Sequence, residues 1–419
     1  MTNCPQLFLA AVLLLCVLAS CGDAAPNASL EQHWLFVEPS VFPYNHMSTI
    51  AQINTTYFVA AWQASHLGEG HEDQRILVSI STNGGQNWTY PRDMLPNPEL
   101  IPFWGPALFW HRGQQRLYCY YSRSNNATAR GPGRYHPGGS IFVTHSDDHG
   151  ASWHTGRELL DFFSPTRGNI AKVTANKPIF VDGTLDKWII PFWQQTEASK
   201  HHPSMNTTGP PCASLLMTTD GGATYQPHGF IHSVNYTFYT IEPSAILTDG
   251  TNSGTVLQYF RTENVGLIYQ SVSRDYGKTW SPIQPTKLLN PDSKVYLSSR
   301  VDFATNKTVS AAVAYNPTLP TSPNSNHVLV LSYTRRPELL NETHGSDAWG
   351  KDPILVFANN SVTGQSSYYP TLIPVDGPGE GKDGGVREHW MCTYTHETVD
   401  HHLGIRIAFV KIEDHVERL

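Results

Sequence analysis

Two charged residues on neighbouring predicted strands stand out in the middle of the chain. Glu242 begins one β-rich run, and Arg261 ends the next run, residues 255–261. Consecutive strands of an antiparallel sheet run in opposite directions, so the start of one and the end of the next lie at the same end of the sheet. The spacing therefore predicts that the Glu242 carboxylate and the Arg261 guanidinium face the same site.

Two other groups of residues could contribute acid–base chemistry. Arg336 follows a predicted strand, with Arg335 beside it, and Tyr368 and Tyr369 come about thirty residues later. An acidic loop near the N-terminus carries three carboxylates, Glu69, Glu72 and Asp73. Carboxyl groups and phenols can exchange protons, whereas guanidinium groups bind anions. A fold that brings these groups to one place would form a reactive site.

A short pattern repeated four times predicts that fold. The pattern reads Ser/Thr-x-Asp/Asn-x-Gly-x-Asn/Ser/Thr-aromatic and covers residues 81–88, 146–153, 218–225 and 273–280. Asp or Asn with Gly makes a tight turn in which the Gly adopts a positive φ, and the aromatic residue packs the turn onto a sheet. The copies lie 55 to 72 residues apart. This spacing suits one four-stranded antiparallel blade per repeat and predicts an all-β propeller.

The β-rich runs between the turns divide the chain into six expected blades. They are predicted at residues 46–105, 106–165, 170–230, 238–290, 295–355 and 365–415, within one propeller domain of residues 34–415. We expect the last strand to pair with N-terminal residues and so close the ring. The turns should lie on the outer rim, which leaves the chemistry to residues near the central axis.

Composition agrees with this class and excludes others. The 419 residues include 32 Gly and 30 Pro, with 11% aromatic and 15% charged residues, as expected of a turn-rich β protein. The net charge of −7 argues against a nucleic-acid partner. No cofactor is expected, and the cysteines and histidines show no metal-ligand spacing.

The N-terminus is expected to be a targeting segment. Residues 7–18 are almost wholly apolar and are followed by small residues, so residues 1–25 are predicted to be a cleaved signal peptide with no stable membrane insertion. Nine Asn-x-Ser/Thr sequons favour a secreted or lumenal glycoprotein. They lie at Asn27, Asn54, Asn87, Asn126, Asn206, Asn235, Asn306, Asn341 and Asn359. Among Cys119, Cys212 and Cys392 we expect one disulfide and one buried thiol.

At its charged and aromatic residues the chain resembles the sialidase (neuraminidase) superfamily, and in particular its BNR repeat-like branch. The resemblance covers about residues 34–412. It rests on the ordered set Glu242, Arg261, the Asp turn, Arg336 and Tyr368, and on four short motifs. These motifs start at His46 (His-Met-Ser-Thr-Ile), Glu69 (Glu-Gly-His-Glu-Asp), Asn176 (Asn-Lys-Pro-Ile) and Tyr369 (Tyr-Pro).

The resemblance implies an enzyme site. Sialidases hold the substrate carboxylate with three arginines, of which Arg261 and Arg336 would be the second and third. They use a tyrosine nucleophile, here Tyr368 or Tyr369, with Glu242 as its base. Neighbouring residues of a strand face opposite ways, so only one tyrosine can face the axis. The spacing from Gly364 suits Tyr368 and the following Pro370 suits Tyr369; we prefer Tyr368.

The resemblance also assigns the acid/base carboxylate and shows two departures. Glu69 or Asp73 would be the acid/base, with Glu72 as a third choice. The usual first arginine is absent, and His46 stands in its place; a protonated histidine could bind a carboxylate. Lys177 could supply the missing charge instead. Lys294 begins a second departure, since the branch has Gly-x-Asp there.

The expected function is that of a secreted exo-glycosidase acting on terminal sialic acid or a related acidic sugar of a glycan. Two alternatives remain. The same site, with different residues binding the substrate carboxylate, could belong to a glycosidase or a polysaccharide lyase that acts on another acidic sugar. A carbohydrate-binding propeller without catalysis would keep the arginines but would not need an activated tyrosine.

Overall fold

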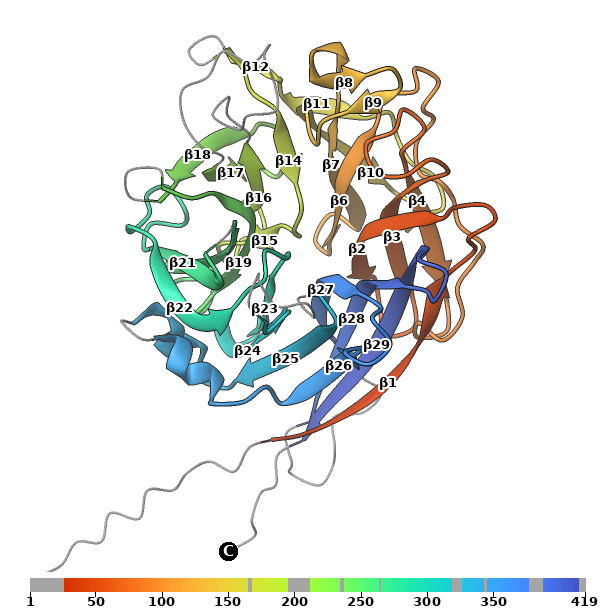
Figure 1. Cartoon of the computed structure of the whole chain (residues 1–419). Helices are drawn as coiled ribbons and strands as arrows, with labels where there is room; N and C mark the ends of the chain where they lie inside the picture. The colour runs from red at the N-terminus through yellow and green to blue at the C-terminus, as the bar shows by residue number, and fades with distance from the viewer. Residues whose placement is uncertain are drawn as a thin grey trace, which may run out of the picture.

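A computed structural model describes residues 26–413 apart from 165–167, 195–211, 234–236, 264, 319–325, 343–344 and 377–386. The described chain is almost entirely β-structure and forms six sheets around a central axis (Figure 1). The predicted signal peptide, residues 1–25, lies outside the described residues. No helix in the described part of the chain has the length and apolar character needed to cross a membrane.

Each sheet is one blade, and the predicted six-bladed propeller is confirmed. Blade 1 contains β2 (Tyr44–Gln52), β3 (Phe58–Ser65), β4 (Arg75–Ser81) and β5 (Arg92–Asp93). Blade 2 contains β6 (Phe103–His111), β7 (Arg116–Arg123), β10 (Ser140–Ser146) and β11 (Arg157–Leu160). Blade 3 contains β14 (Lys172–Thr174), β15 (Ile179–Phe180), β16 (Trp188–Gln194), β17 (Cys212–Thr218) and β18 (Gln226–Ile231).

The second half of the chain repeats the arrangement. Blade 4 contains β19 (Thr240–Leu247), β20 (Val256–Thr262), β21 (Leu267–Ser273) and β22 (Gln284–Leu289). Blade 5 contains β23 (Tyr296–Asp302), β24 (Lys307–Tyr315), β25 (Val328–Thr334) and β26 (Leu355–Asn359). Blade 6 contains β27 (Ser367–Val375), β28 (Arg387–Glu397), β29 (Leu403–Glu413) and the N-terminal β1 (Asn27–Phe36).

Small elements lie between these sheets. β8 (Ala129–Gly131) pairs with β9 (Arg134–Tyr135), and β12 (Phe163–Ser164) pairs with β13 (Gly168–Asn169). The described residues also contain three short 3₁₀ helices: η1 (Asn126–Thr128), η3 (Pro337–Asn341) and η4 (Gly345–Trp349).

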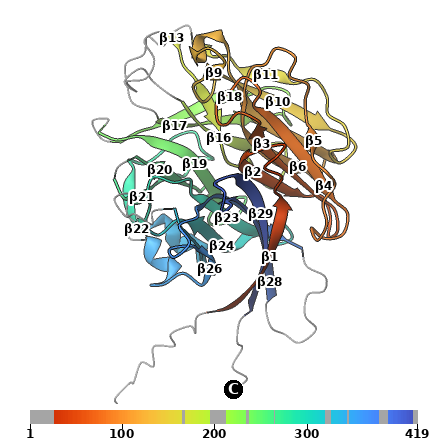
Figure 2. The ribbon, with the colours of Figure 1, turned by 45° about the vertical axis from the view of Figure 1, so that its right-hand side comes forward.

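The ring closes as predicted, by pairing of the two ends of the described chain. β1 runs antiparallel to β29, from the pair Asn27 and Glu413 to the pair Phe36 and Ile405. β1 therefore forms the outermost strand of blade 6, while the other three strands of that blade come from the C-terminal end (Figure 2). This exchange joins the first and last blades through backbone hydrogen bonds and covers the edge of β29.

The four repeated turns connect the third and fourth strands of blades 1 to 4, on the outer rim as expected. In the second turn the Asp148 carboxylate accepts hydrogen bonds from Ser152 N at 2.7 Å and from Ser146 Oγ at 2.7 Å. Gly150 has a φ of 92°, which favours glycine. Partial burial alone would raise the pKa of Asp148, but these hydrogen bonds lower it to about 2.

The expected disulfide is wrong. Cys119, Cys212 and Cys392 are all free and buried, and they lie in blades 2, 3 and 6 respectively. A disulfide needs two Cα atoms within roughly 7 Å. Thiols in the cores of separate blades act as small apolar side chains instead.

The turn geometry makes a testable prediction for stability. Asp148→Ala should lower the free energy of unfolding by about 1–2 kcal/mol, because the donors that Asp148 satisfies lose their partner. The matched control is Asp147→Ala, next in the chain, whose ion pair with Arg116 is exposed and should contribute less than about 0.5 kcal/mol. Urea unfolding curves measure both. Equal effects of the two variants would contradict the assigned role of the turn carboxylate.

Candidate active site

The inner strands of four blades share an irregularity at the end where the site forms. The pairing register shifts after His46 in β2, Trp104 in β6, Ile241 in β19 and Tyr368 in β27. The next residue has a positive φ in each case: 52° at Met47, 52° at Gly105, 50° at Glu242 and 56° at Tyr369. A bulge of this kind re-aims a side chain that regular alternation would send elsewhere.

The glycine at one of these bulges is required by space. A Cβ on Gly105 would lie 1.7 Å from the carbonyl oxygen of Thr174. The other three positions hold larger residues in a conformation that costs on the order of 1–3 kcal/mol. Such strain is typical of functional sites, so it directs attention to Glu242 and Tyr369.

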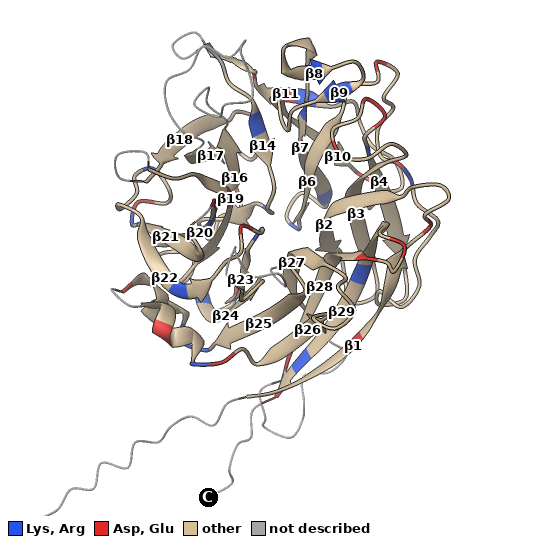
Figure 3. Ribbon diagram, viewed as in Figure 1, with Lys and Arg blue, Asp and Glu red and all other residues tan. Residues whose placement is uncertain are grey.

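Glu242, Arg261 and Tyr369 form a hydrogen-bonded group, which we call the axial cluster. Arg261 Nη1 donates to both carboxylate oxygens of Glu242 at 3.1 Å and to Tyr369 Oη at 2.5 Å. Tyr369 Oη donates to Glu242 Oε1 at 2.8 Å. The sequence placed Glu242 and Arg261 at the same end of blade 4, and the structure brings them into contact. Over the described chain as a whole, most of the ribbon is tan in Figure 3, which marks residues other than Lys, Arg, Asp and Glu.

The electrostatics of the cluster keep the Tyr369 phenol protonated. Burial raises the pKa of Tyr369 well above its ordinary value, and the Glu242 and Glu69 carboxylates raise it further, whereas Arg261 opposes them. Burial alone would lower the pKa of Arg261, but Glu242, Tyr369 and Asp292 raise it well above its usual range. The phenol can therefore become a nucleophile only if a neighbouring group takes its proton, and Glu242 is in hydrogen-bonding contact.

The preference for Tyr368 over Tyr369 is not supported by this geometry. The Tyr368 ring packs 5.3 Å from the His46 ring and 5.6 Å from the Tyr369 ring, centroid to centroid. Within the described part of the chain its hydroxyl has no hydrogen-bond partner, whereas Tyr369 Oη contacts both Glu242 and Arg261. The prediction relied on the spacing from Gly364, which does not register the bulge that redirects the Tyr369 side chain.

The acidic loop contributes one carboxylate to the site. Glu69 is solvent-exposed, yet loss of hydration at this position raises the pKa of its carboxyl. A hydrogen bond from Tyr44 opposes that shift, and the Glu242 charge adds to it. Asp73 instead closes its own loop, accepting from Ser65 Oγ at 2.6 Å and His66 N at 2.7 Å. Glu69 is therefore the better placed of the two candidates to exchange protons.

His46 is at the site but cannot supply the missing positive charge. It is buried, its ring centroid lies 4.2 Å from that of Tyr369, and its Nδ1 bonds Thr395 Oγ1 at 2.9 Å. Burial, with the Lys294 and Arg261 charges nearby, lowers the pKa of His46 to about 3. The imidazole is therefore neutral at physiological pH, contrary to the expectation of a protonated clamp.

Arg336 and Lys177 lie outside the axial cluster. Arg336 follows β25, whose last residue, Thr334, pairs with Ala311, which in turn pairs with Ser299. Ser299 is in the middle of the inner strand β23 (Tyr296–Asp302), and β25 runs parallel to β23. Arg336 lies two residues further toward the end of β23 that is away from the axial cluster, and it is exposed. Lys177 lines a cavity at the same far end of the inner strands. Of the two predicted clamp arginines, only Arg261 lies beside Tyr369.

Two residues that the sequence did not assign complete the site. Asp292 accepts from Arg261 Nε at 2.7 Å. Lys294 is fully buried and donates to the Pro370 carbonyl at 3.1 Å and to Thr371 Oγ1 at 3.3 Å. These bonds hold the backbone that follows the bulge at Tyr369. Burial lowers the pKa of Lys294 to about 8, although Glu242 opposes the shift. The sequence carried one signal for Lys294: it begins a stretch that departs from the family pattern.

The low pKa of His46 predicts a pH dependence of stability. The unfolded chain binds a proton at His46 below about pH 6.5, whereas the folded chain does so only near pH 3. Stability should therefore fall with decreasing pH across this window, by up to about 1.4 kcal/mol per unit from this group. His46→Gln should remove that share of the slope, as measured by thermal melts of the variant and the wild type. An unchanged slope in the variant would contradict a neutral His46.

Comparison with known proteins places this site in a family. The model of the BNR repeat-like domain matches residues 56–377. No curated protein matches the sequence. A protein of unknown function from Dyadobacter fermentans has a similar structure, with 13% identity and a TM-score of 0.70 over 92% of this chain and 100% of its own.

The NanB sialidase from Streptococcus pneumoniae is also similar, with 12% identity and a TM-score of 0.60 over 91% of this chain and 70% of its own. At these identities the likeness to solved structures shows the fold alone. The family model covers most of the sequence, and the chain belongs to the BNR repeat-like domain family.

Proposed function

We propose that this protein is a retaining glycoside hydrolase of the sialidase type, which removes a terminal acidic sugar from glycans through a tyrosine nucleophile. The observation that carries the proposal is the contact of Tyr369 Oη with the Glu242 carboxylate at 2.8 Å and with Arg261 at 2.5 Å. A strained backbone at both Glu242 and Tyr369 holds these groups at the axial end of their strands.

The proposed reaction assigns one step to each group. Tyr369 Oη attacks the anomeric carbon while Glu242 takes the phenolic proton, and the bond to the leaving oxygen breaks. Glu69, whose carboxyl pKa is raised by loss of hydration, is the proposed acid and gives a proton to the leaving oxygen. Glu69 then takes a proton from water, which displaces the tyrosine, and Glu242 returns the phenolic proton. Two displacements at one carbon retain its configuration.

A phenol nucleophile favours an acidic sugar as substrate. A carboxylate nucleophile would be repelled by an acid group next to the anomeric carbon, whereas the protonated Tyr369 is neutral as it is approached. In Arg261, Nε donates to Asp292, and Nη1 donates to Glu242 and Tyr369. Nη2 has no hydrogen-bond partner among the described residues. One guanidinium nitrogen can therefore receive a substrate carboxylate, and we expect weaker binding than three arginines would give.

One observation favours a second candidate, a polysaccharide lyase acting on an acidic sugar. A neutral imidazole lies against the nucleophile candidate, with the ring centroids of His46 and Tyr369 4.2 Å apart. A neutral imidazole and a phenol are groups that can remove one proton and deliver another in an elimination. The products distinguish the two reactions, because elimination leaves an unsaturated sugar that absorbs in the ultraviolet.

The test is turnover of the 4-methylumbelliferyl conjugate of sialic acid by the purified protein, from about pH 4 to 7. Tyr369→Phe should reduce the rate by about a thousandfold, since the attacking oxygen is removed. Tyr368→Phe, the matched control on the adjacent residue, should stay within about threefold of the wild type.

Three outcomes would contradict the proposal. Equal losses in the two tyrosine variants would remove the assigned nucleophile. Release of unsaturated products from an acidic polysaccharide, without hydrolysis, would identify a lyase. Glycan binding without turnover, unchanged in Tyr369→Phe, would identify a carbohydrate-binding propeller.

We further propose that the chain is secreted after removal of residues 1–25 and carries N-linked glycans. Four sequon asparagines on the described blades, together with Asn27, are exposed: Asn54, Asn87, Asn126 and Asn359. Asn341 is different, because its Nδ2 donates to Thr248 Oγ1 at 2.5 Å and to Asp249 at 3.3 Å. Asn206 and Asn235 lie outside the described residues.

Site mapping checks this proposal. In protein expressed through a eukaryotic secretory pathway, peptide mass spectrometry after enzymatic deglycosylation should show modification at the exposed asparagines and an unmodified Asn341. A glycan on Asn341 would displace its hydrogen bonds to Thr248 and Asp249. Complete modification of Asn341, or an unmodified set of exposed sites, would contradict it.

A further inference from the structure

A cavity lies at the opposite end of the inner strands from the axial cluster. Its volume is about 340 Å³. Every blade contributes to its wall, through the C-terminal parts of β2, β6, β19, β23 and β27 and through β15. In β2, for example, His46 lies at the axial cluster and Gln52 lines the cavity. Six residues of extended strand separate them, roughly 20 Å. The two sites are therefore distinct.

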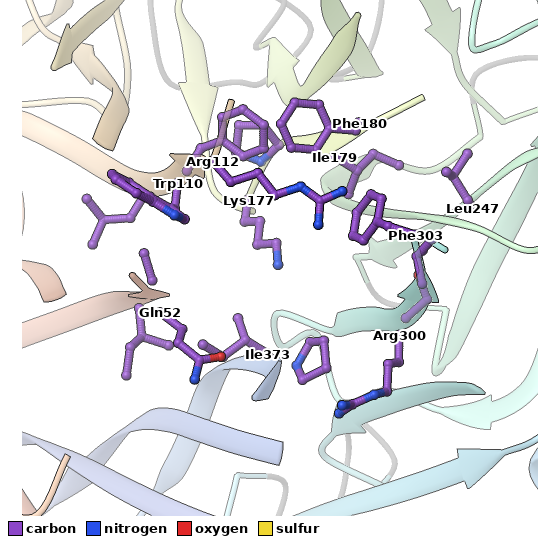
Figure 4. A pocket seen from close by; sticks show the side chains of 18 of the residues that line it. Gln52, Trp110, Arg112, Lys177, Ile179, Phe180, Leu247, Arg300, Phe303 and Ile373 are labelled. Atoms are coloured by element: carbon purple, nitrogen blue, oxygen red, sulfur yellow. The ribbon is translucent and has the colours of Figure 1, made fainter. Parts of the chain in front are cut away.

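Positive charge dominates the wall of this cavity. Lys177, Arg112 and Arg300 line it, against one carboxylate, Asp376. Arg300 Nη2 lies 3.6 Å from the Asp376 carboxylate, which is largely exposed. Figure 4 shows the ends of Lys177 and Arg112 directed into the cavity, with Arg300 across from them. Two of the three cations thus have no carboxylate within ion-pair distance among the described residues.

Of the three cations, Lys177 has the charge that is least favourable in these surroundings. Burial lowers the pKa of its ammonium to about 8, and no described residue forms a hydrogen bond or ion pair with that ammonium. A partly desolvated charge without a partner binds an incoming anion more strongly than a surface lysine would. The motif that carries Lys177 was singled out in the sequence, and the axial cluster makes no use of this side chain.

Most of the remaining wall is apolar or aromatic, although Gln52, Thr251 and Ser299 also line it. Arg112 lies over the ring of Phe303, with 3.5 Å from its guanidinium carbon to the ring centroid. Phe180, Trp110 and Ile373 also line the cavity. A wall of this kind packs against a carbon skeleton, which inorganic ions lack. The volume is at the lower end of small-molecule sites, which span about 300–1,000 Å³.

We propose that this cavity is a second binding site, for a small organic carboxylate of monosaccharide size such as a sugar acid. Lys177 and Arg112 bind the carboxylate, and the Phe303 and Phe180 rings pack against the carbon skeleton. The site does not depend on the reaction proposed for the axial cluster, because it uses none of the same side chains.

The test is calorimetric titration of the full mature chain with glucuronate. Lys177→Met should weaken binding at least about tenfold, since a desolvated cation is lost, and Lys177→Arg should restore most of it. The matched control is Lys278→Met, an exposed lysine in a rim turn, which should leave the affinity unchanged. Glucose tests the need for the carboxylate, and sulfate alone tests the need for the carbon skeleton.

Each remaining outcome would overturn the proposal. Unchanged glucuronate binding in Lys177→Met would place the ligand elsewhere, including at the axial cluster. Equal binding of glucose would remove the role of the cations, and equal binding of sulfate would remove the role of the aromatic wall. Absence of glucuronate binding by the wild-type protein would also exclude the site. Arg261→Lys provides the opposite control, because it alters the axial cluster and should leave this binding intact.

Discussion

The left-handed backbone at Glu242 and Tyr369 is the constraint on which the site depends. In a regular strand these side chains would alternate away from the axis, and the bulges redirect them toward each other. Such a backbone is unfavourable for residues other than glycine, so the surrounding structure must hold it. Asn176 does so by donating to the carbonyls of Glu242 and Pro243, at 3.0 and 2.8 Å. Lys294 does so for Tyr369 through the Pro370 carbonyl.

Charge balance follows from this geometry. Arg261 is largely buried, with its side chain 16% exposed, and a buried guanidinium is tolerable only when it is paired. Glu242 and Asp292 provide that pairing from two directions. The same contacts orient Glu242 toward the phenol and limit how much of Arg261 a substrate can reach. A single residue thus stabilises the cluster and determines how an acidic group would bind there.

The propeller gives the axis two chemically different ends. The inner strands run parallel to one another around the axis, so residues at their starts meet at one end and residues near their finishes meet at the other. Carboxylates, a tyrosine and one paired arginine gather at the first end, whereas unpaired cations and aromatic rings line the cavity at the second. The ring can hold both because pairing of β1 with β29 closes it and fixes the blades relative to each other.

The sequence alone determined the features that depend on residues close together in the chain. Turn residues at regular spacing specify the blades, and antiparallel neighbours such as β19 and β20 must place Glu242 and Arg261 at one end, since hairpin geometry acts over short stretches of chain. Proline after the bulged residue, at Pro106, Pro243 and Pro370, was a further local signal that could have favoured Tyr369.

Only the tertiary structure decided what depends on contacts between blades. Tyr369, not Tyr368, meets Glu242 because a bulge in blade 6 faces a bulge in blade 4. His46 is neutral because burial and the Lys294 and Arg261 charges act on it from other blades. Arg336 lies outside the axial cluster because its strand runs toward the other end, and Lys177 does so because its side chain lines the cavity there. Closing the ring brings together residues far apart in the chain, and no local pattern records which of them will meet.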